Sequence, residues 1–288
     1  MNFKSANRFP VYGWFGILLI AVFWFLNWNL SGLRTQWGFF PLWLGYCLTV
    51  DAVVFLKKNT SLLTRNYKAY IGLFLISAPT WWLFELLNGF THNWYYDGRQ
   101  YFTNLEYAIL ATISFSIVIP AVFGTAEFVS TFKWVKKFNR GPRLRTTKRT
   151  LAILLLIGVL LLILIITFPA LFYPFIWLTI YLIVDPFNVI LKNRSLLQYT
   201  SSPDWRPVIT LSTAALICGF FWEMWNYFSY PKWIYFLPHV NFFHIFEMPI
   251  LGYIGYIFFP FELFAIYNLI MGIFFKNKLN NYVHVLPE

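Results

Sequence analysis

Two stretches of the sequence place an ionisable glutamate among aromatic residues. In WWLFELLNGF, Glu85 lies three positions before Asn88, and in FFWEMWNY, Glu223 lies three positions before Asn226. Side chains three residues apart project from one face of a helix. A carboxyl in apolar surroundings holds its proton more strongly than in water, which suits it to act as a general acid near neutral pH. The spacing therefore indicates a proton-transfer site that occurs twice in the chain.

Composition indicates the surroundings in which these residues act. Of the 288 residues, 59% are hydrophobic and 11% are charged, whereas soluble domains contain about 25% charged residues. Several apolar runs reach the ~20 residues that a helix needs to cross a bilayer. We therefore expect an all-α polytopic membrane protein with about eight transmembrane helices, at residues 11–30, 37–56, 69–90, 105–128, 151–172, 174–191, 207–229 and 244–272.

The basic residues are unevenly distributed between these spans. If the N-terminus is cytoplasmic, 19 of the 22 lysines and arginines fall in inner segments, and only Arg34, Arg99 and Lys232 fall outside. This pattern follows the positive-inside rule and predicts that both termini are cytoplasmic. Because topology explains the net charge of +11, we predict no nucleic-acid partner. The basic segment 133–149 instead favours contact with anionic lipid headgroups.

The chain contains an internal repeat. Residues 39–66 and 173–200 align without a gap and share ten identities in 28 positions. With small shifts the match extends to Glu85/Glu223, Asn88/Asn226, Trp94/Trp233, Tyr96/Tyr235 and Glu106/Glu247. Four spans per repeat keep both halves in one orientation, so we predict parallel repeats. The predicted regions are a first four-helix membrane repeat (1–132), a basic cytoplasmic linker (133–150) and a second four-helix membrane repeat (151–288).

The repeated glutamates are expected near the outer face. Glu85 and Glu223 lie ~25 Å of helix from the inner surface, and Glu106 and Glu247 are expected to open the following spans. Four carboxyls are thus expected to meet. Because an ionised carboxyl at mid-bilayer costs at least ~2.5 kcal/mol, such placement indicates function. The alternative is that hydrogen bonds from Asn and Trp donors make these carboxyls structural.

Two further pairs of acids are assigned other roles. Asp51 and Asp185 each precede an inner lysine by seven residues, so we favour pairing with that lysine or with backbone N–H groups over catalysis. Glu127 and Glu262 have no counterparts in the repeat and are interpreted as interfacial.

A metal site is an alternative use of three of the outer residues, His244, Glu247 and Glu223. We do not expect it, because the first half has Thr103 where His244 would repeat and the neighbours are aromatic. No GxGxxG, Walker or DDxxD motif occurs, so no cofactor is predicted.

These residues resemble the small integral-membrane lycopene cyclase domain of bacterial and archaeal carotenoid pathways, which is also built from two repeats. Over about 90 residues in each half, the resemblance runs through YCLTVD at 46–51, Trp82, Glu85, Trp94 and Glu106. The family carries Pro-x-Glu-Glu at its last helix start, where this chain has Leu-Glu-Tyr and Phe-Glu-Met-Pro. The resemblance implies that Glu106 and Glu247 protonate a polyene. Glu85 and Glu223 would support them, in a bacterial inner membrane.

Two classes of function remain open. The first is an intramembrane enzyme, a cyclase or isomerase, that rearranges an isoprenoid or other lipid by proton transfer between Glu223 and Glu247. Asn226 would orient these carboxyls, and Glu85, Glu106 and Asn88 would repeat the set. The expected substrate-binding residues are Trp222, Trp225, Trp233, Trp81, Trp82 and His244. The second class is a transporter or lipid-binding membrane protein, which repeats and buried acids suit equally.

Overall fold

The computed structural model describes residues 8–275 and 281–286 of the chain, and its secondary structure is almost entirely helical. Within these residues, seven helices are long and apolar enough to cross a membrane, and a bent helix pair makes a possible eighth span. The protein is an all-α polytopic membrane protein, as the apolar runs predict. Lys4, Lys276 and Lys278, which enter the count of inner basic residues, lie outside the described residues.

The elements follow one another in two comparable series. Those before the linker are α1 (Val11–Asn29), α2 (Thr35–Lys58), α3 (Leu62–Arg65), α4 (Tyr67–Thr91), β1 (Trp94–Asp97), η1 (Arg99–Tyr101), α5 (Asn104–Phe115) and α6 (Val118–Ser130). The others are η2 (Lys133–Phe138), α7 (Lys148–Thr167), α8 (Pro169–Phe172), η3 (Tyr173–Trp177), α9 (Thr179–Ile190), α10 (Leu196–Ser201), α11 (Arg206–Tyr227), β2 (Lys232–Tyr235), β3 (His244–Ile245), β4 (Met248–Pro249), η4 (Ile250–Ile254) and α12 (Gly255–Phe275).

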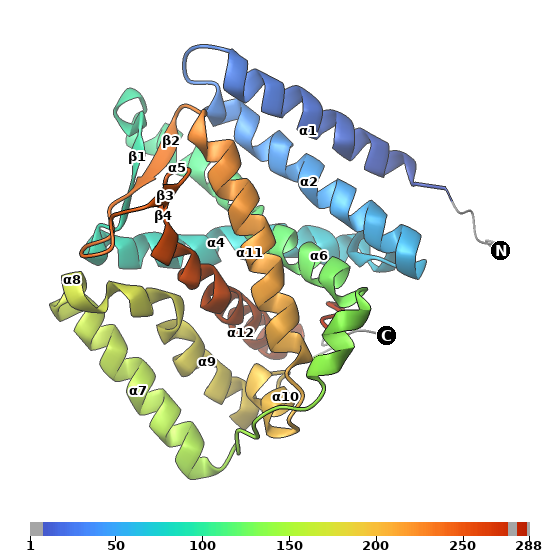
Figure 1. Ribbon diagram of the computed structural model, residues 1–288, viewed down its shortest axis with the longest axis vertical. Coiled ribbons are helices and arrows are strands. Elements are labelled where there is room, and N and C mark those ends of the chain that lie inside the picture. Colours follow the sequence, from blue (N-terminus) through green and yellow to red (C-terminus); the bar gives the residue numbers. More distant parts are fainter. Residues whose placement is uncertain (1–7, 276–280, 287–288) are drawn as a thin grey trace.

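The helices form a central group with one layer on each flank (Figure 1). Helices α1 and α2 run side by side on one flank, α7 lies on the opposite flank, and α4, α6, α11 and α12 lie between them. The α1–α2 contact depends on glycine. A Cβ atom on Gly16 would lie 2.8 Å from the carbonyl oxygen of Gly45, and one on Gly45 would lie 2.7 Å from that of Gly16. Small residues let membrane helices approach this closely.

Three of the expected spans are interrupted. The span at 105–128 is divided into α5 and α6, because the Ser77 hydroxyl donates to Phe115 O (2.6 Å) and accepts from Ile119 N (3.0 Å) across the break. A side chain inserted in this way replaces a helical hydrogen bond. The span at 174–191 bends by 43° between η3 and α9. Glu262 supports this bend, since its Oε1 accepts from Ile180 N at 2.8 Å.

The third interrupted span corrects a prediction about Glu247. We expected residue 244 to begin the last span, with Glu247 in its first turn. Instead residues 244–249 form the β3–β4 hairpin, Glu247 lies in its turn, and the helical segment starts at Ile250.

Residues matched between the two halves make matching contacts at Asp51 and Asp185. Asp51 accepts from Leu63 N at 3.0 Å, and Asp185 accepts from Leu197 N at 2.9 Å. Each carboxyl therefore caps the short helix that follows its own span, α3 or α10. Of the two partners considered for these acids, the structure shows the backbone.

The core of the protein joins the two halves. Trp43 of α2 packs against Trp222 of α11 with ring centroids 5.0 Å apart, and its repeat partner Trp177 packs against Phe84 of α4 at 5.5 Å. Each half thus contributes a tryptophan to the other half.

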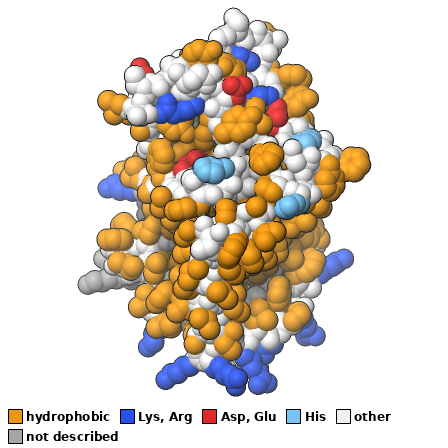
Figure 2. Space-filling view, turned by 90° about the vertical axis from the view of Figure 1, so that its left-hand side faces the viewer, with side chains coloured by type: hydrophobic (Ala, Val, Ile, Leu, Met, Phe, Trp, Pro, Cys, Tyr) orange, Lys and Arg blue, Asp and Glu red, His pale blue; other side chains and the backbone are white. Residues whose placement is uncertain are grey.

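The surface has the character expected of a membrane protein. In Figure 2, Lys and Arg side chains gather at the lower edge, and acidic and histidine side chains lie in the upper part. Hydrophobic side chains dominate the surface between them.

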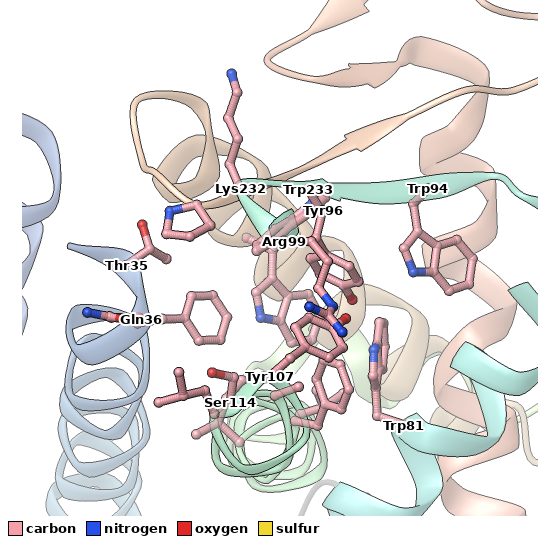
Figure 3. Close-up of a pocket in the computed structure, with 18 of the residues that line it drawn as sticks. Thr35, Gln36, Trp81, Trp94, Tyr96, Arg99, Tyr107, Ser114, Lys232 and Trp233 are labelled. Carbon is pink, nitrogen blue, oxygen red and sulfur yellow. The ribbon is translucent and has the colours of Figure 1, made fainter. Parts of the chain in front are cut away.

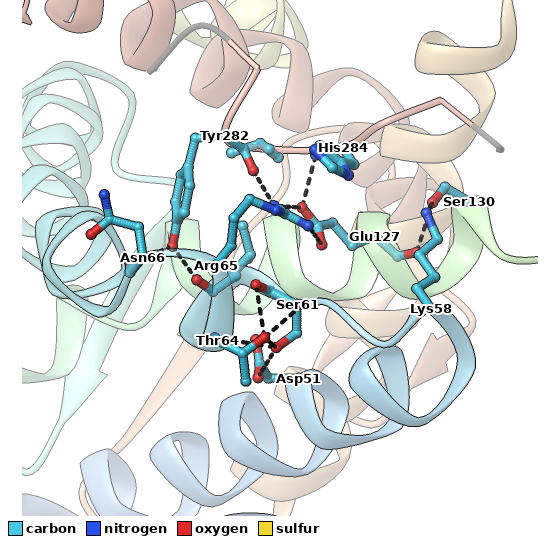
Figure 4. Close-up of polar contacts among 12 residues, drawn as sticks. Asp51, Lys58, Ser61, Thr64, Arg65, Asn66, Glu127, Ser130, Tyr282 and His284 are labelled. Carbon is cyan, nitrogen blue, oxygen red and sulfur yellow. Dashed lines mark hydrogen bonds and ion pairs between the residues drawn. The ribbon is translucent and has the colours of Figure 1, made fainter. Parts of the chain in front are cut away.

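A segment near the C-terminus packs between the halves at the level of Asp51 (Figure 4). Arg65 donates to Glu127 (2.9 and 3.1 Å) and also to Tyr282 O, and His284 N donates to Glu127 at 2.8 Å. Val283 is fully buried. Glu127 and Glu262, which the sequence analysis interprets as interfacial, are both buried inside the protein, with 1% and 0% of their surface exposed.

Candidate functional site

A two-stranded ribbon joins the two halves at the end of the molecule where Glu85 and Glu223 lie. Strand β1 pairs antiparallel with β2, with Trp94 opposite Tyr235 and Tyr96 opposite Trp233. Trp94 and Trp233, and likewise Tyr96 and Tyr235, are the residues that the sequence repeat matches. The ribbon therefore has local two-fold symmetry, and it holds matching aromatic residues from both halves next to each other.

Asn88 and Asn226 fasten this ribbon to the helices. The Asn88 amide donates to Trp94 O at 2.8 Å and accepts from Trp94 N at 3.2 Å and Asn93 N at 2.8 Å. Asn226 donates to Trp233 O at 2.7 Å and accepts from Trp233 N at 3.0 Å. Both amides are thus engaged with the backbone, and the bonds place the first tryptophan of each strand above the preceding helix.

Glu85 lies on α4 below strand β1. Its Oε1 accepts three hydrogen bonds, from Trp81 Nε1 (3.0 Å), Trp94 Nε1 (3.0 Å) and Tyr96 OH (2.6 Å). Trp81 is one turn earlier on the same helix, and the other two donors come from the strand. Burial and the neighbouring carboxyl raise the pKa of Tyr96 well above the usual value of a tyrosine. Tyr96 therefore remains a neutral donor.

Glu223 occupies the equivalent place on α11 and is completely buried. Its Oε1 accepts from Tyr256 OH (2.6 Å) and Tyr235 OH (2.9 Å). Its Oε2 has no hydrogen-bond partner among the described residues. The same is true of the indole Nε1 of Trp233 in strand β2. Burial and Glu223 raise the pKa of Tyr235 well above the usual value, so this hydroxyl too stays protonated. An unpaired buried oxygen can still bind a proton or a donor.

A cavity of about 170 Å³ separates the two carboxyl clusters. Its wall includes donors to Glu85 (Trp81, Trp94 and Tyr96) and donors to Glu223 (Tyr235 and Tyr256). Figure 3 shows the labelled aromatic rings clustered around this space, with Gln36 and Thr35 of α2 on one side. The cavity is therefore apolar and aromatic, with both carboxyls one hydrogen bond away from residues of its wall.

The other predicted carboxyls do not join this cluster. Glu106 is exposed and forms a capping box at the start of α5, since its Oε2 accepts from Thr103 N (2.8 Å) and Thr103 Oγ1 (2.7 Å). Glu247 forms an ion pair with Lys232. Four carboxyls therefore do not meet around one point: Glu106 caps its own helix, and Glu247 reaches the cavity wall only through Lys232.

The prediction that His244 begins the last span was wrong. His244 is exposed in β3, where it contacts Asn241 Oδ1 at 3.3 Å, and it does not begin a helix. The part of the chain that the structure describes contains no group of three His, Cys, Asp or Glu residues that could hold a metal ion.

Three of the five predicted tryptophans reach the cavity. Trp81, Trp222 and Trp233 belong to its wall. Trp225 instead packs against Trp43 at 5.0 Å between α11 and α2. Trp82 donates to Thr112 Oγ1 at 3.0 Å, between α4 and α5.

Sequence reasoning missed several wall residues. Tyr96 and Tyr235 carried a signal, because they are matched between the repeats, and so did Trp177, which is matched with Trp43. Tyr256 carried no such signal, because the repeat does not match it with an aromatic residue of the first half.

Comparison of the chain with models of protein families, with curated proteins and with solved structures gives no match.

Proposed function

We propose that the protein is an intramembrane enzyme that rearranges an isoprenoid or related lipid by proton transfer. One observation supports this most directly: two repeat-related glutamates are hydrogen-bonded to the side chains that line one aromatic cavity. The reaction class is that of a cyclase or isomerase. The resemblance to lycopene cyclase pointed to Glu106 and Glu247 as acids, but the cavity geometry favours Glu223 and Glu85.

In the proposed reaction, one proton is added and another is removed. Glu223 supplies a proton to an alkene carbon through the hydroxyl of Tyr256 or Tyr235, so that a C–H bond forms and the carboxyl becomes ionised. The resulting carbocation is stabilised by the faces of the surrounding aromatic rings. Loss of a proton from a neighbouring carbon, to Glu85 through Tyr96, removes the positive charge from the hydrocarbon, and proton exchange with solvent returns both carboxyls to their starting states. Isomerisation or ring closure by this route requires no oxidant and no reductant.

Deuterium uptake tests the proposal. The purified protein is incubated in D₂O with the unlabelled lipids extracted from the cells that produced it, and the lipids are analysed by mass spectrometry. We expect deuterium in an unsaturated chain with the native protein and none with the Glu85→Gln, Glu223→Gln double variant. Glutamine keeps the size of the side chain and removes the titratable proton. Equal labelling by both proteins, or none by either, would overturn the enzyme proposal.

A transporter is the second candidate, and Glu262 favours it. This carboxyl is fully buried at the bend between η3 and α9, and its Oε2 has no partner among the described residues. Interrupted helices with a polar group at the break are common at transport sites. Proton-driven uptake by proteoliposomes that Glu262→Gln abolishes, with no lipid labelling, would support this candidate.

We also propose that both termini are cytoplasmic, in a bacterial inner membrane, with segment 133–149 against anionic headgroups. The support is the distribution of basic residues. A reporter fused after Asn139 is expected to read cytoplasmic, and one after Asp97 external. An external reading at Asn139 would contradict this topology.

A further inference from the structure

The basic residues on the predicted outer side indicate which charged group the ligand carries. Only Arg34, Arg99 and Lys232 lie there. Arg34 is used by the backbone, since it donates to Asn27 O (2.8 Å), Gly32 O (3.0 Å) and Phe228 O (2.7 Å). Lys232 is neutralised by Glu247. Arg34 does not belong to the cavity wall, whereas Arg99 and Lys232 do. Arg99 is therefore the cation of the wall that is left without a carboxylate partner among the described residues.

Arg99 is placed at the cavity by a tight turn. Gly98 precedes it with φ of 94°, a conformation that favours glycine, and a Cβ there would lie 2.8 Å from Pro231. The turn directs Arg99 back over the cavity, whose wall it joins. In Figure 3 its side chain lies among the rings near Tyr96 and Tyr107, whereas Lys232 points away from them. The guanidinium carbon is 4.2 Å from the Tyr107 ring centroid.

The charge of Arg99 has no carboxylate partner within the described residues. Its guanidinium donates to two neutral oxygens, Phe102 O at 2.7 Å and Asn104 Oδ1 at 2.5 Å. These bonds occupy two of the five N–H groups of the side chain. An arginine fork held in this way by neutral acceptors and an aromatic face suits recognition of an anionic oxygen group.

We propose that the ligand is an amphiphile with an anionic headgroup, carboxylate or phosphate, that binds Arg99 and places its adjacent carbons in the aromatic cavity. The inference rests on the proposed function, because it names the substrate class of the same site. The volume of about 170 Å³ is close to that of apolar cavities that hold one benzene molecule. The cavity therefore takes the carbons next to the headgroup, and the rest of a long chain lies outside.

A fluorescent polyene fatty acid provides the test. Five of the 14 tryptophans line the cavity, Trp81, Trp94, Trp177, Trp222 and Trp233. Energy transfer to cis-parinaric acid therefore reports binding to the protein, and its dependence on Arg99 locates the probe at the cavity. The acid is compared with its neutral methyl ester, above the pKa of the free acid. We expect the acid to bind at least about tenfold more tightly than the ester, because a charge-assisted pair with arginine forms with the acid alone.

Substitution of Arg99 separates headgroup binding from folding. In Arg99→Gln the preference for the acid should fall to about twofold or less while ester binding is unchanged. The exposed linker residue provides a matched control, since Arg149→Gln removes the same charge far from the cavity and should keep the preference. Equal loss of acid and ester binding in Arg99→Gln, or no preference in the native protein, would overturn the inference.

Competition identifies the headgroup and separates the two proposals. Displacement of the probe by farnesyl monophosphate but not by palmitate assigns phosphate, the reverse assigns carboxylate, and displacement by uncharged farnesol as strong as by either anion overturns the inference. If neither probe shows energy transfer, both the cavity and the headgroup assignment are wrong. If the acid preference is present but no deuterium enters any lipid, the enzyme proposal alone fails.

Discussion

Glu85 and Glu223 occupy equivalent places in the repeat but have different surroundings. Glu85 is partly exposed, and its Oε1 is held by two indoles and a phenol. Glu223 is fully buried, is held by two phenols, and keeps one oxygen without a partner among the described residues. The first arrangement fixes a carboxylate in place. The second leaves one carboxyl oxygen without a partner among the described residues. In the proposed reaction the first arrangement suits the proton acceptor, Glu85, and the second suits the proton donor, Glu223.

One substitution explains much of this divergence. Trp81, which donates to Glu85, lies four residues before it, and the equivalent position before Glu223 is Gly219. A Cβ on Gly219 would lie 2.6 Å from the Tyr256 ring. The missing side chain therefore makes room for Tyr256, which takes over as donor to Glu223. The second half has exchanged an indole from its own helix for a hydroxyl from α12.

The largest expected effect is the difference between the glutamates in catalysis. Glu223→Gln should lower the rate of deuterium uptake by about 10²-fold or more, the usual contribution of general acid catalysis. Glu85→Gln should lower this rate less. Three hydrogen-bond donors hold the Glu85 carboxylate, and its role in the proposed reaction is to accept the departing proton. The rates are measured on proteins that elute as folded monodisperse species. Equal losses in the two variants would show that the copies have not diverged in function.

The next effect concerns the space at Gly219. Gly219→Ala should lower the free energy of unfolding by about 1–3 kcal/mol, as overpacking does, and displace Tyr256. Gly72→Ala is the control, because a Cβ there meets nothing within 4 Å, and on a helix this change is neutral or stabilising by up to ~1 kcal/mol. Unfolding in detergent and SDS mixtures, followed by tryptophan fluorescence, measures both. Similar stabilities for the two variants would refute the role of Gly219.

The smallest effect compares the matched strand tryptophans. Trp94→Phe removes a hydrogen bond to Glu85 and should cost about 1–2 kcal/mol of stability. Trp233→Phe removes an indole N–H that has no partner among the described residues, so its cost should be smaller by about 1 kcal/mol. The same unfolding assay measures both. A larger loss for Trp233→Phe would show that its N–H is engaged with Glu223.

The sequence was sufficient to predict an all-α membrane protein and to match Glu85 with Glu223 in the repeat, because both predictions depend on local sequence patterns. The role of Glu106 was also readable, since Thr103 three residues earlier completes a capping-box signature. The breaks in the spans could not be predicted from the sequence. They depend on Ser77 and Glu262, side chains from other helices that satisfy the freed backbone groups. The position of Tyr256 likewise depends on the space that Gly219 leaves beside it. Contacts of this kind between distant residues cannot be predicted from hydropathy.

The contact between Glu127 and the segment at 282–284 has a consequence for biogenesis. His284, which donates to Glu127, is synthesised 157 residues after it. Before that, Arg65 is the one other partner of the Glu127 carboxyl among the described residues, and the buried position of Val283 is not yet filled. We expect the newly inserted chain to remain sensitive to membrane proteases until this segment docks. Docking thus marks the end of assembly, and a tag placed directly after residue 286 would interfere with it more than an N-terminal one.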